Sequence, residues 1–102
     1  MMDQTEFGQR ADTMLDSIAE AVEGADSDWD VEFEGGILTI EAADGGQFVI
    51  NKHAPNRQIW LSSPKSGAWH FAWDEASARW ISTRDGSVSL NQIVAKDLGV
   101  VV

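Results

Sequence analysis

The segment from Asp28 to Glu34 limits the folds open to this chain more than any other part of the sequence. Its letters, DWDVEFE, place apolar residues at positions 29, 31 and 33 and acidic residues at the four positions around them. Successive side chains of a β-strand point to opposite faces, so this period of two predicts a strand with one buried and one solvated face. Gly35-Gly36 follows directly and predicts a tight hairpin turn. The chain is therefore expected to contain an antiparallel sheet.

The remaining strands are predicted from the same kind of pattern. Ile37 to Glu41 is expected to form the second strand, and Asp44-Gly45-Gly46 the second turn. Four more strands are expected over residues 47–52, 58–62, 68–73 and 79–83, with a loop over 51–57 between the third and fourth strands.

A helix is predicted at each end of the chain. The first, over roughly residues 4–23 with Gly24 as a stop signal, has an apolar stripe at three- and four-residue spacing: Phe7, Ala11, Met14, Leu15, Ile18 and Val22. The second follows a capping box of Ser89 and Gln92 and can be capped by Gly99; its stripe is Leu90, Ile93, Val94 and Leu98. Two such helices can cover one face of one sheet. We therefore expect a single α+β domain over residues 1–102, a two-layer sandwich of about six antiparallel strands whose other sheet face is largely open.

The charge is concentrated in the first part of the chain. The net charge is −10, and residues 1–44 hold 13 acidic residues and one basic residue, Arg10. This part should repel nucleic acid and anionic lipid and attract cations and basic protein surfaces. No apolar run approaches the ~20 residues of a membrane span, and the polar, acidic residues 1–10 do not resemble a signal peptide. Together with the lack of cysteine, these features are consistent with a cytoplasmic protein.

The acidic residues form two rows. On the first helix, Asp12, Asp16, Glu20 and Glu23 fall within an arc of about 80°, nearly opposite the apolar stripe. The second row is the acidic face of the strand that starts at Asp28. Carboxylate oxygens suit hard cations, but Asp26, Asp28 and Asp30 do not begin an EF-hand loop, because Val31 and Ile37 stand where that loop needs Gly and Glu. The spacing favours several weakly held ions on an open surface, and a merely solvated acidic face remains the alternative.

Other residues point to a contact surface and not to catalysis. Trp60 alternates with Ile59 and Leu61 and so faces away from the core, which indicates a partner-binding surface. The alternatives are packing on neighbouring strand residues and a strand register shifted by one residue. His53 lies in the expected loop, and His70 is interpreted as an outer-face strand residue. We find no nucleophile elbow, phosphate loop, dinucleotide fingerprint or HExxH motif, so no enzyme is expected.

Residues 51–67 resemble the signature of the frataxin family. The matching residues are Asn51-Lys52, Pro55, the run from Gln58 to Pro64, and Ser66-Gly67. The acidic first helix, the Asp-rich first strand, the Gly-Gly turn and the Leu-Thr-Ile at 38–40 are also similar to this family, so that the likeness covers residues 4–98. The short ends resemble those of bacterial members. Gly24 is a departure, because many members extend the acidic run there.

The resemblance implies a protein that binds Fe2+ and Fe3+ weakly and serves iron–sulfur cluster assembly, with other divalent or trivalent cations as possible substitutes. It implies docking on a cysteine desulfurase and scaffold complex, as iron donor, as regulator of the desulfurase, or both. It also implies a monomer that can form metal-dependent oligomers. The metal-binding positions carried over, called here the acidic ridge, are Asp16, Glu20, Glu23, Asp26, Asp28, Asp30 and Glu32. The partner-binding positions carried over are Asn51, Gln58 and Trp60. An acidic interaction module that regulates a basic partner without metal is the alternative function.

Overall fold

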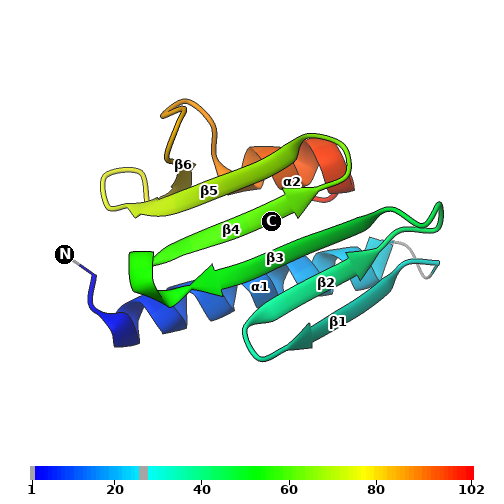
Figure 1. Ribbon diagram of the computed structural model, residues 1–102, viewed down its shortest axis with the longest axis horizontal. Coiled ribbons are helices and arrows are strands. Elements are labelled where there is room, and N and C mark those ends of the chain that lie inside the picture. The colour runs from blue at the N-terminus through cyan, green and yellow to red at the C-terminus, as the bar shows by residue number, and fades with distance from the viewer. Residues whose placement is uncertain (1, 26–27) are drawn as a thin grey trace.

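The computed structural model describes residues 2–25 and 28–102. A helix opens the chain, six strands follow in one sheet, and a second helix closes it (Figure 1). The elements are α1 (Gln4–Ala25), β1 (Asp30–Glu34), β2 (Ile37–Glu41), β3 (Gln47–His53), a short 3-10 helix (Ala54–Asn56), β4 (Gln58–Ser63), β5 (Gly67–Asp74), β6 (Arg79–Ser82) and α2 (Leu90–Leu98). This confirms the expected helix–sheet–helix order.

The sheet is an antiparallel meander in which each strand pairs with the next one in sequence. Gly35 and Gly36, which join β1 to β2, have φ values of 62° and 79°. Glycine adopts such positive φ angles readily, so the Gly-Gly pair permits the tight turn that sets the register of the hairpin. Because the strand order is sequential, β1 and β6 form the two edges of the sheet.

Both helices pack on the same face of the sheet and leave the other face open, as Figure 1 shows from the open side. The strands bury alternate residues against the helices: Leu38, Ile40, Phe48, Ile50, Ile59, Leu61, Phe71 and Trp80. The helices contribute their apolar stripes, with Phe7, Ala11, Leu15, Ile18 and Val22 from α1 and Leu90, Ile93, Val94 and Leu98 from α2. The two-layer α+β sandwich predicted from the sequence is therefore confirmed.

The ends of several elements differ from the sequence-based expectation. Helix α1 continues through Gly24 to Ala25, because a glycine only weakens a helix and does not block its hydrogen bonds. Strand β1 begins at Asp30 and not at Asp28, because Asp30 already pairs with Glu41, the last residue of β2. The loop expected over 51–57 is also wrong in part: β3 continues to His53, which pairs with Gln58 of β4.

Helix α2 begins and ends as the sequence predicts. Ser89 accepts a hydrogen bond from the backbone N–H of Gln92, and the Gln92 side chain accepts one from the backbone N–H of Ser89. Gly99 ends the helix in the left-handed conformation, with φ of 73°. These caps satisfy backbone groups that would otherwise lose their hydrogen bonds at the helix ends.

A buried polar cluster attaches α2 to the turn between β4 and β5. Asp97 is only 3% exposed, and its carboxylate accepts hydrogen bonds from the hydroxyls of Ser63, at 2.7 Å, and Ser66. Trp69 donates its indole N–H to the Ser66 hydroxyl at 2.9 Å. No local pattern in the sequence predicts this cluster.

Among the described residues, no helix is both long and apolar enough to cross a membrane.

Candidate functional site

The helical part of the acidic ridge lies on the solvent side of α1. Asp16, Glu20 and Glu23 are exposed, while the residues between them that face the sheet are buried. Asp12, one turn before Asp16, is half-exposed and lies 2.8 Å from the ammonium group of Lys52 on β3. Lys52 therefore offsets the charge of Asp12. The negative surface of α1 consists of the next three carboxylates, Asp16, Glu20 and Glu23.

The strand part of the ridge lies at an edge of the sheet. Asp30 and Glu32 are exposed residues of β1, and Asp28 is exposed just before the strand. Helix α1 packs against β1, so the two rows of carboxylates lie on neighbouring elements. Asp26, which the sequence also placed in the ridge, lies outside the described residues.

The chemistry of this surface is that of scattered oxygen ligands. Within residues 2–25 and 28–102, no three carboxylate or imidazole side chains are grouped closely enough to hold one metal ion. Carboxylate oxygens suit hard cations, Fe3+ among them, and exposed carboxylates can bind such an ion with water completing the coordination shell. The donor set therefore fits loosely held, exchangeable cargo ions better than a resident metal cofactor.

The candidate partner-binding residues form a second site on the open face of the sheet. Trp60 lies opposite Asn51 on β3 and His70 on β5, with its side chain directed away from the core. Its indole N–H donates a 2.8 Å hydrogen bond to the side-chain oxygen of Gln58. The structure therefore brings the three predicted partner-binding residues together.

Trp60 points outward as the sequence predicts, but its side chain is half-buried. Its ring is stacked between two imidazoles: the His53 ring centroid lies 3.7 Å away with the planes at 9°, and the His70 centroid lies 4.2 Å away at 8°. Packing on neighbouring strand residues, which was one alternative interpretation of Trp60, therefore occurs as well. The contact of His53 with Trp60 is not predicted from the sequence, because the expected loop over 51–57 contains His53. The signal that could have found it is the alternation Val49, Asn51, His53 along β3.

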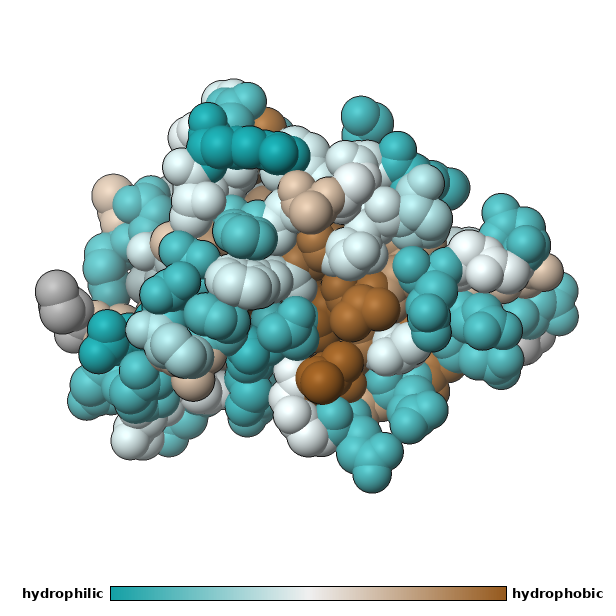
Figure 2. Space-filling model, in the orientation of Figure 1, coloured by the Kyte–Doolittle hydropathy of each residue, from teal (hydrophilic) through white to brown (hydrophobic). Residues whose placement is uncertain are grey.

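The open face around Trp60 carries no acidic, lysine or arginine side chain at its centre, where Ile37 and Val49 add apolar surface. Ile37 of β2 belongs to the same cross-strand row, next to Asn51, and is 47% exposed. Val49 is the neighbouring outward residue of β3. Figure 2 shows hydrophobic colouring in the middle of this face, with hydrophilic residues around it. An apolar centre with a polar rim is the usual composition of a protein-binding surface.

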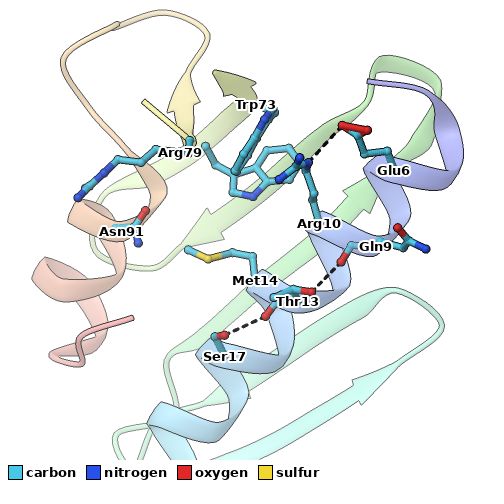
Figure 3. Close-up of a pocket in the computed structure, with 11 residues that line it drawn as sticks. Glu6, Gln9, Arg10, Thr13, Met14, Ser17, Trp73, Arg79 and Asn91 are labelled. Carbon is cyan, nitrogen blue, oxygen red and sulfur yellow. Dashed lines mark hydrogen bonds and ion pairs between the residues drawn. The ribbon is translucent and has the colours of Figure 1, made fainter. Parts of the chain in front are cut away.

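A groove lies on the opposite, helical face. It has a volume of about 670 Å³ and is lined by residues of α1, β5, β6 and α2 (Figure 3). Arg10 occupies its edge, where its guanidinium carbon is 4.6 Å from the centroid of the Trp73 ring and its Nε is 3.3 Å from Glu6. None of the residues predicted to bind metal or partner lines this groove.

The sequence also matches known proteins along its whole length. A family model described as a frataxin-like domain matches residues 1–102. The chain belongs to the frataxin-like family. This confirms the resemblance inferred from residues 51–67.

Two bacterial proteins named iron–sulfur cluster assembly protein CyaY are similar in sequence to this frataxin-like chain. The protein of Neisseria meningitidis serogroup B is 40% identical over 86 residues, which cover 84% of this chain and 78% of the relative. That of Vibrio cholerae serotype O1 is 41% identical over 85 residues, which cover 83% of this chain and 79% of the relative.

Solved frataxin structures share the fold. Frataxin from Psychromonas ingrahamii aligns with a TM-score of 0.78 at 28% identity, over 99% of this chain and 96% of that one. Trimeric frataxin from Saccharomyces cerevisiae, complexed with ferrous iron, aligns with a TM-score of 0.75 at 36% identity, over 88% of this chain and 82% of that one. Both the match to the family model and the alignment with solved structures therefore support the frataxin-like fold.

Proposed function

We propose that this chain binds Fe2+ and Fe3+ weakly and acts in iron–sulfur cluster assembly, as an iron donor to a cysteine desulfurase–scaffold complex, as a regulator of that complex, or as both. The observation that carries this proposal is the pairing of two surfaces: exposed carboxylates on α1 and β1, and an uncharged area around Trp60 at the centre of the open sheet face. The names of the CyaY relatives and the ferrous complex of the yeast neighbour support it.

The acidic ridge would hold the iron. Asp16, Glu20 and Glu23 supply oxygen ligands from α1, and Asp28, Asp30 and Glu32 supply them from the edge of the sheet. Asp26 is the seventh proposed ligand. Because the six ligands within the described residues are exposed, water can enter and leave the coordination shell, and an ion can pass to a partner. Weak and reversible binding is what a donor requires.

The same ridge would attract a basic surface of the partner complex. Long-range attraction between a net charge of −10 and a basic surface raises the association rate, but it adds little contact energy of its own. Trp60, with Gln58 and Asn51 beside it, would supply the short-range contact energy that long-range electrostatic attraction does not provide. Because iron and partner use the same carboxylates, iron occupancy should change the affinity for the partner.

Thermal unfolding with and without metal tests the ridge. A ligand that binds only the folded state stabilises it, so Fe2+ added without oxygen should raise the melting temperature. The variant D16N/E20Q/D28N/D30N should lose most of this rise. A control variant, D74N/E75Q/D85N, removes carboxylates near the opposite edge of the sheet and should keep the full rise. An unchanged rise in the first variant would show that the ridge is not the site.

A second candidate function uses the same surfaces without metal. The ridge would also serve an acidic module that regulates a basic partner by charge alone. Titration of the chain against the purified desulfurase–scaffold complex separates the two functions. Affinity that falls with salt and also changes with Fe2+ supports the iron-linked function, whereas affinity that falls with salt but ignores Fe2+ supports the metal-free module.

A further inference from the structure

The three stacked rings of His53, Trp60 and His70 leave no face of the indole uncovered. Both imidazole planes are within 9° of the indole plane, and the ring centroids of His53 and His70 lie 3.7 Å and 4.2 Å from the ring centroid of Trp60. The hydrogen bond from the indole N–H to Gln58 fixes the remaining rotation of the ring. A partner can therefore reach the full face of Trp60 only if one imidazole moves aside. His70 is the more exposed of the two.

The two histidines are also the ionisable residues at the centre of the open sheet face. The other outward positions of β3, β4 and the first six residues of β5 carry no charge; they are Gln47, Val49, Asn51, Gln58, Ser62, Ala68 and Ala72. Histidine is the side chain that ordinarily changes its charge between about pH 5 and 8. Protonation of both rings would therefore give an uncharged surface two positive charges.

The charged groups nearest the stack are of types that do not ordinarily titrate in this range. Lys52 precedes His53 but pairs with Asp12 of α1, on the helical side. Glu34 lies at the β1 end of the row that contains Trp60 and His70. Asp30 and Glu32 of β1 and Glu41 of β2 also lie on the open face, toward its β1 edge. Around the other strands, the charged groups include Arg57 before β4, Asp74 and Arg79 at the paired ends of β5 and β6, and Arg84, which lies over Trp69.

We propose that His53 and His70 make partner docking through Trp60 dependent on pH, with docking weakened when the imidazoles are protonated. This inference rests on the proposed function, in which the partner is the basic protein surface that the ridge attracts. Two effects act in the same direction. An imidazolium over an indole face gains a cation–π attraction, which holds the stack closed. The added positive charge also repels a basic partner surface.

The first measurement needs no partner. The chain contains five Trp residues, so labelling with 5-fluorotryptophan gives five fluorine signals, and the Trp60 signal is identified by its absence in W60F. From pH 8 to pH 5, the Trp60 signal should shift along a titration curve. In H53Q/H70Q this titration should disappear. A Trp60 signal that does not respond to pH in the unmodified chain would overturn the proposal.

The second measurement is the affinity for the purified cysteine desulfurase–scaffold complex at pH 7.5 and pH 6.0. The partner has titrating groups of its own, so the comparison is between the two chains. The loss of affinity on acidification should be at least about threefold larger for the unmodified chain than for H53Q/H70Q, as expected from repulsion near a contact. H70Q alone, at the more exposed position, should show an intermediate loss of affinity. This single variant keeps the test valid if the double variant does not fold.

The outcomes separate this inference from the proposed function. Equal loss of affinity in the unmodified chain and in H53Q/H70Q overturns the inference alone. Absence of binding at both pH values overturns the assignment of the partner and, with it, the docking role of the stack. Binding whose pH dependence is removed by the two substitutions supports both.

Discussion

Ser63 and Asp97 are 34 residues apart in sequence, yet the Ser63 hydroxyl donates a 2.7 Å hydrogen bond to the Asp97 carboxylate inside the protein. The same Ser63 oxygen accepts hydrogen bonds from the backbone N–H groups of Lys65 and Ser66. This contact joins α2 to the turn after β4, the strand that carries Trp60. Helix α2 therefore supports the strand of the candidate docking site from the opposite face of the sheet.

Replacement of Asp97 by Ala should destabilise the protein. The hydroxyls of Ser63 and Ser66 would lose their common acceptor, and each unsatisfied buried donor costs about 1–3 kcal/mol. We expect the free energy of unfolding in urea to fall by about 2–4 kcal/mol. D97N keeps one acceptor oxygen and should lose less. A D97A variant as stable as the unmodified chain would contradict a structural role for this cluster.

Replacement of Asp16 by Asn should stabilise the metal-free protein. Asp16 is four residues from both Asp12 and Glu20 on α1, and like charges at this spacing cost a few tenths of a kcal/mol per pair. The expected gain in the free energy of unfolding is about 0.4–1 kcal/mol at low salt. It should shrink in 1 M salt, where charges are screened within about 3 Å. E75Q, outside the ridge, is the control and should show little change.

Replacement of Gly24 by Ala should also stabilise the protein. Gly24 is a helical residue of α1, and a Cβ atom added there would meet no other atom within 4 Å. Alanine restricts the unfolded chain and favours the helix, which predicts a gain of about 0.5–1 kcal/mol in urea unfolding. Gly36→Ala is a useful contrast, because its φ is 79° and the new Cβ would lie 2.9 Å from Cε of Lys52. That variant should be destabilised.

The contribution of Asp85 to stability should depend on pH. Hydrogen bonds from the Ser87 hydroxyl and from the Ser87 backbone N–H lower the pKa of Asp85 from its ordinary value, with a smaller contribution from the nearby Arg84. A carboxyl group whose pKa is lower in the folded state stabilises the protein above its unfolded pKa, and this stabilisation is lost as the pH falls through the folded pKa. D85N should therefore be less stable than the unmodified chain at pH 7. The two urea midpoints should converge as the pH falls below about 4. A constant difference between them would contradict the prediction.

The elements of this fold and the faces they bury can be predicted from the amino-acid sequence alone. The alternation at 28–34, the Gly-Gly turn and the capping box at Ser89 are local signals, because the physics behind them acts between residues a few positions apart. They were sufficient to predict the helix–sheet–helix order, the outward direction of Trp60 and the acidic stripe of α1. Local signals also left errors of a few residues at Asp28 and His53, where pairing with a neighbouring strand decides the boundary, and at Gly24, which weakens the helix without ending it.

Contacts between distant side chains become visible only in the folded protein. Alternation shows that Trp60 points outward, but the strand register places it between His53 and His70. In the same way, Asp97 reads as one more acidic residue on a helix until packing buries it against Ser63. The physical reason is that burial and ring stacking depend on contacts between distant segments, and no local pattern of polarity contains that information.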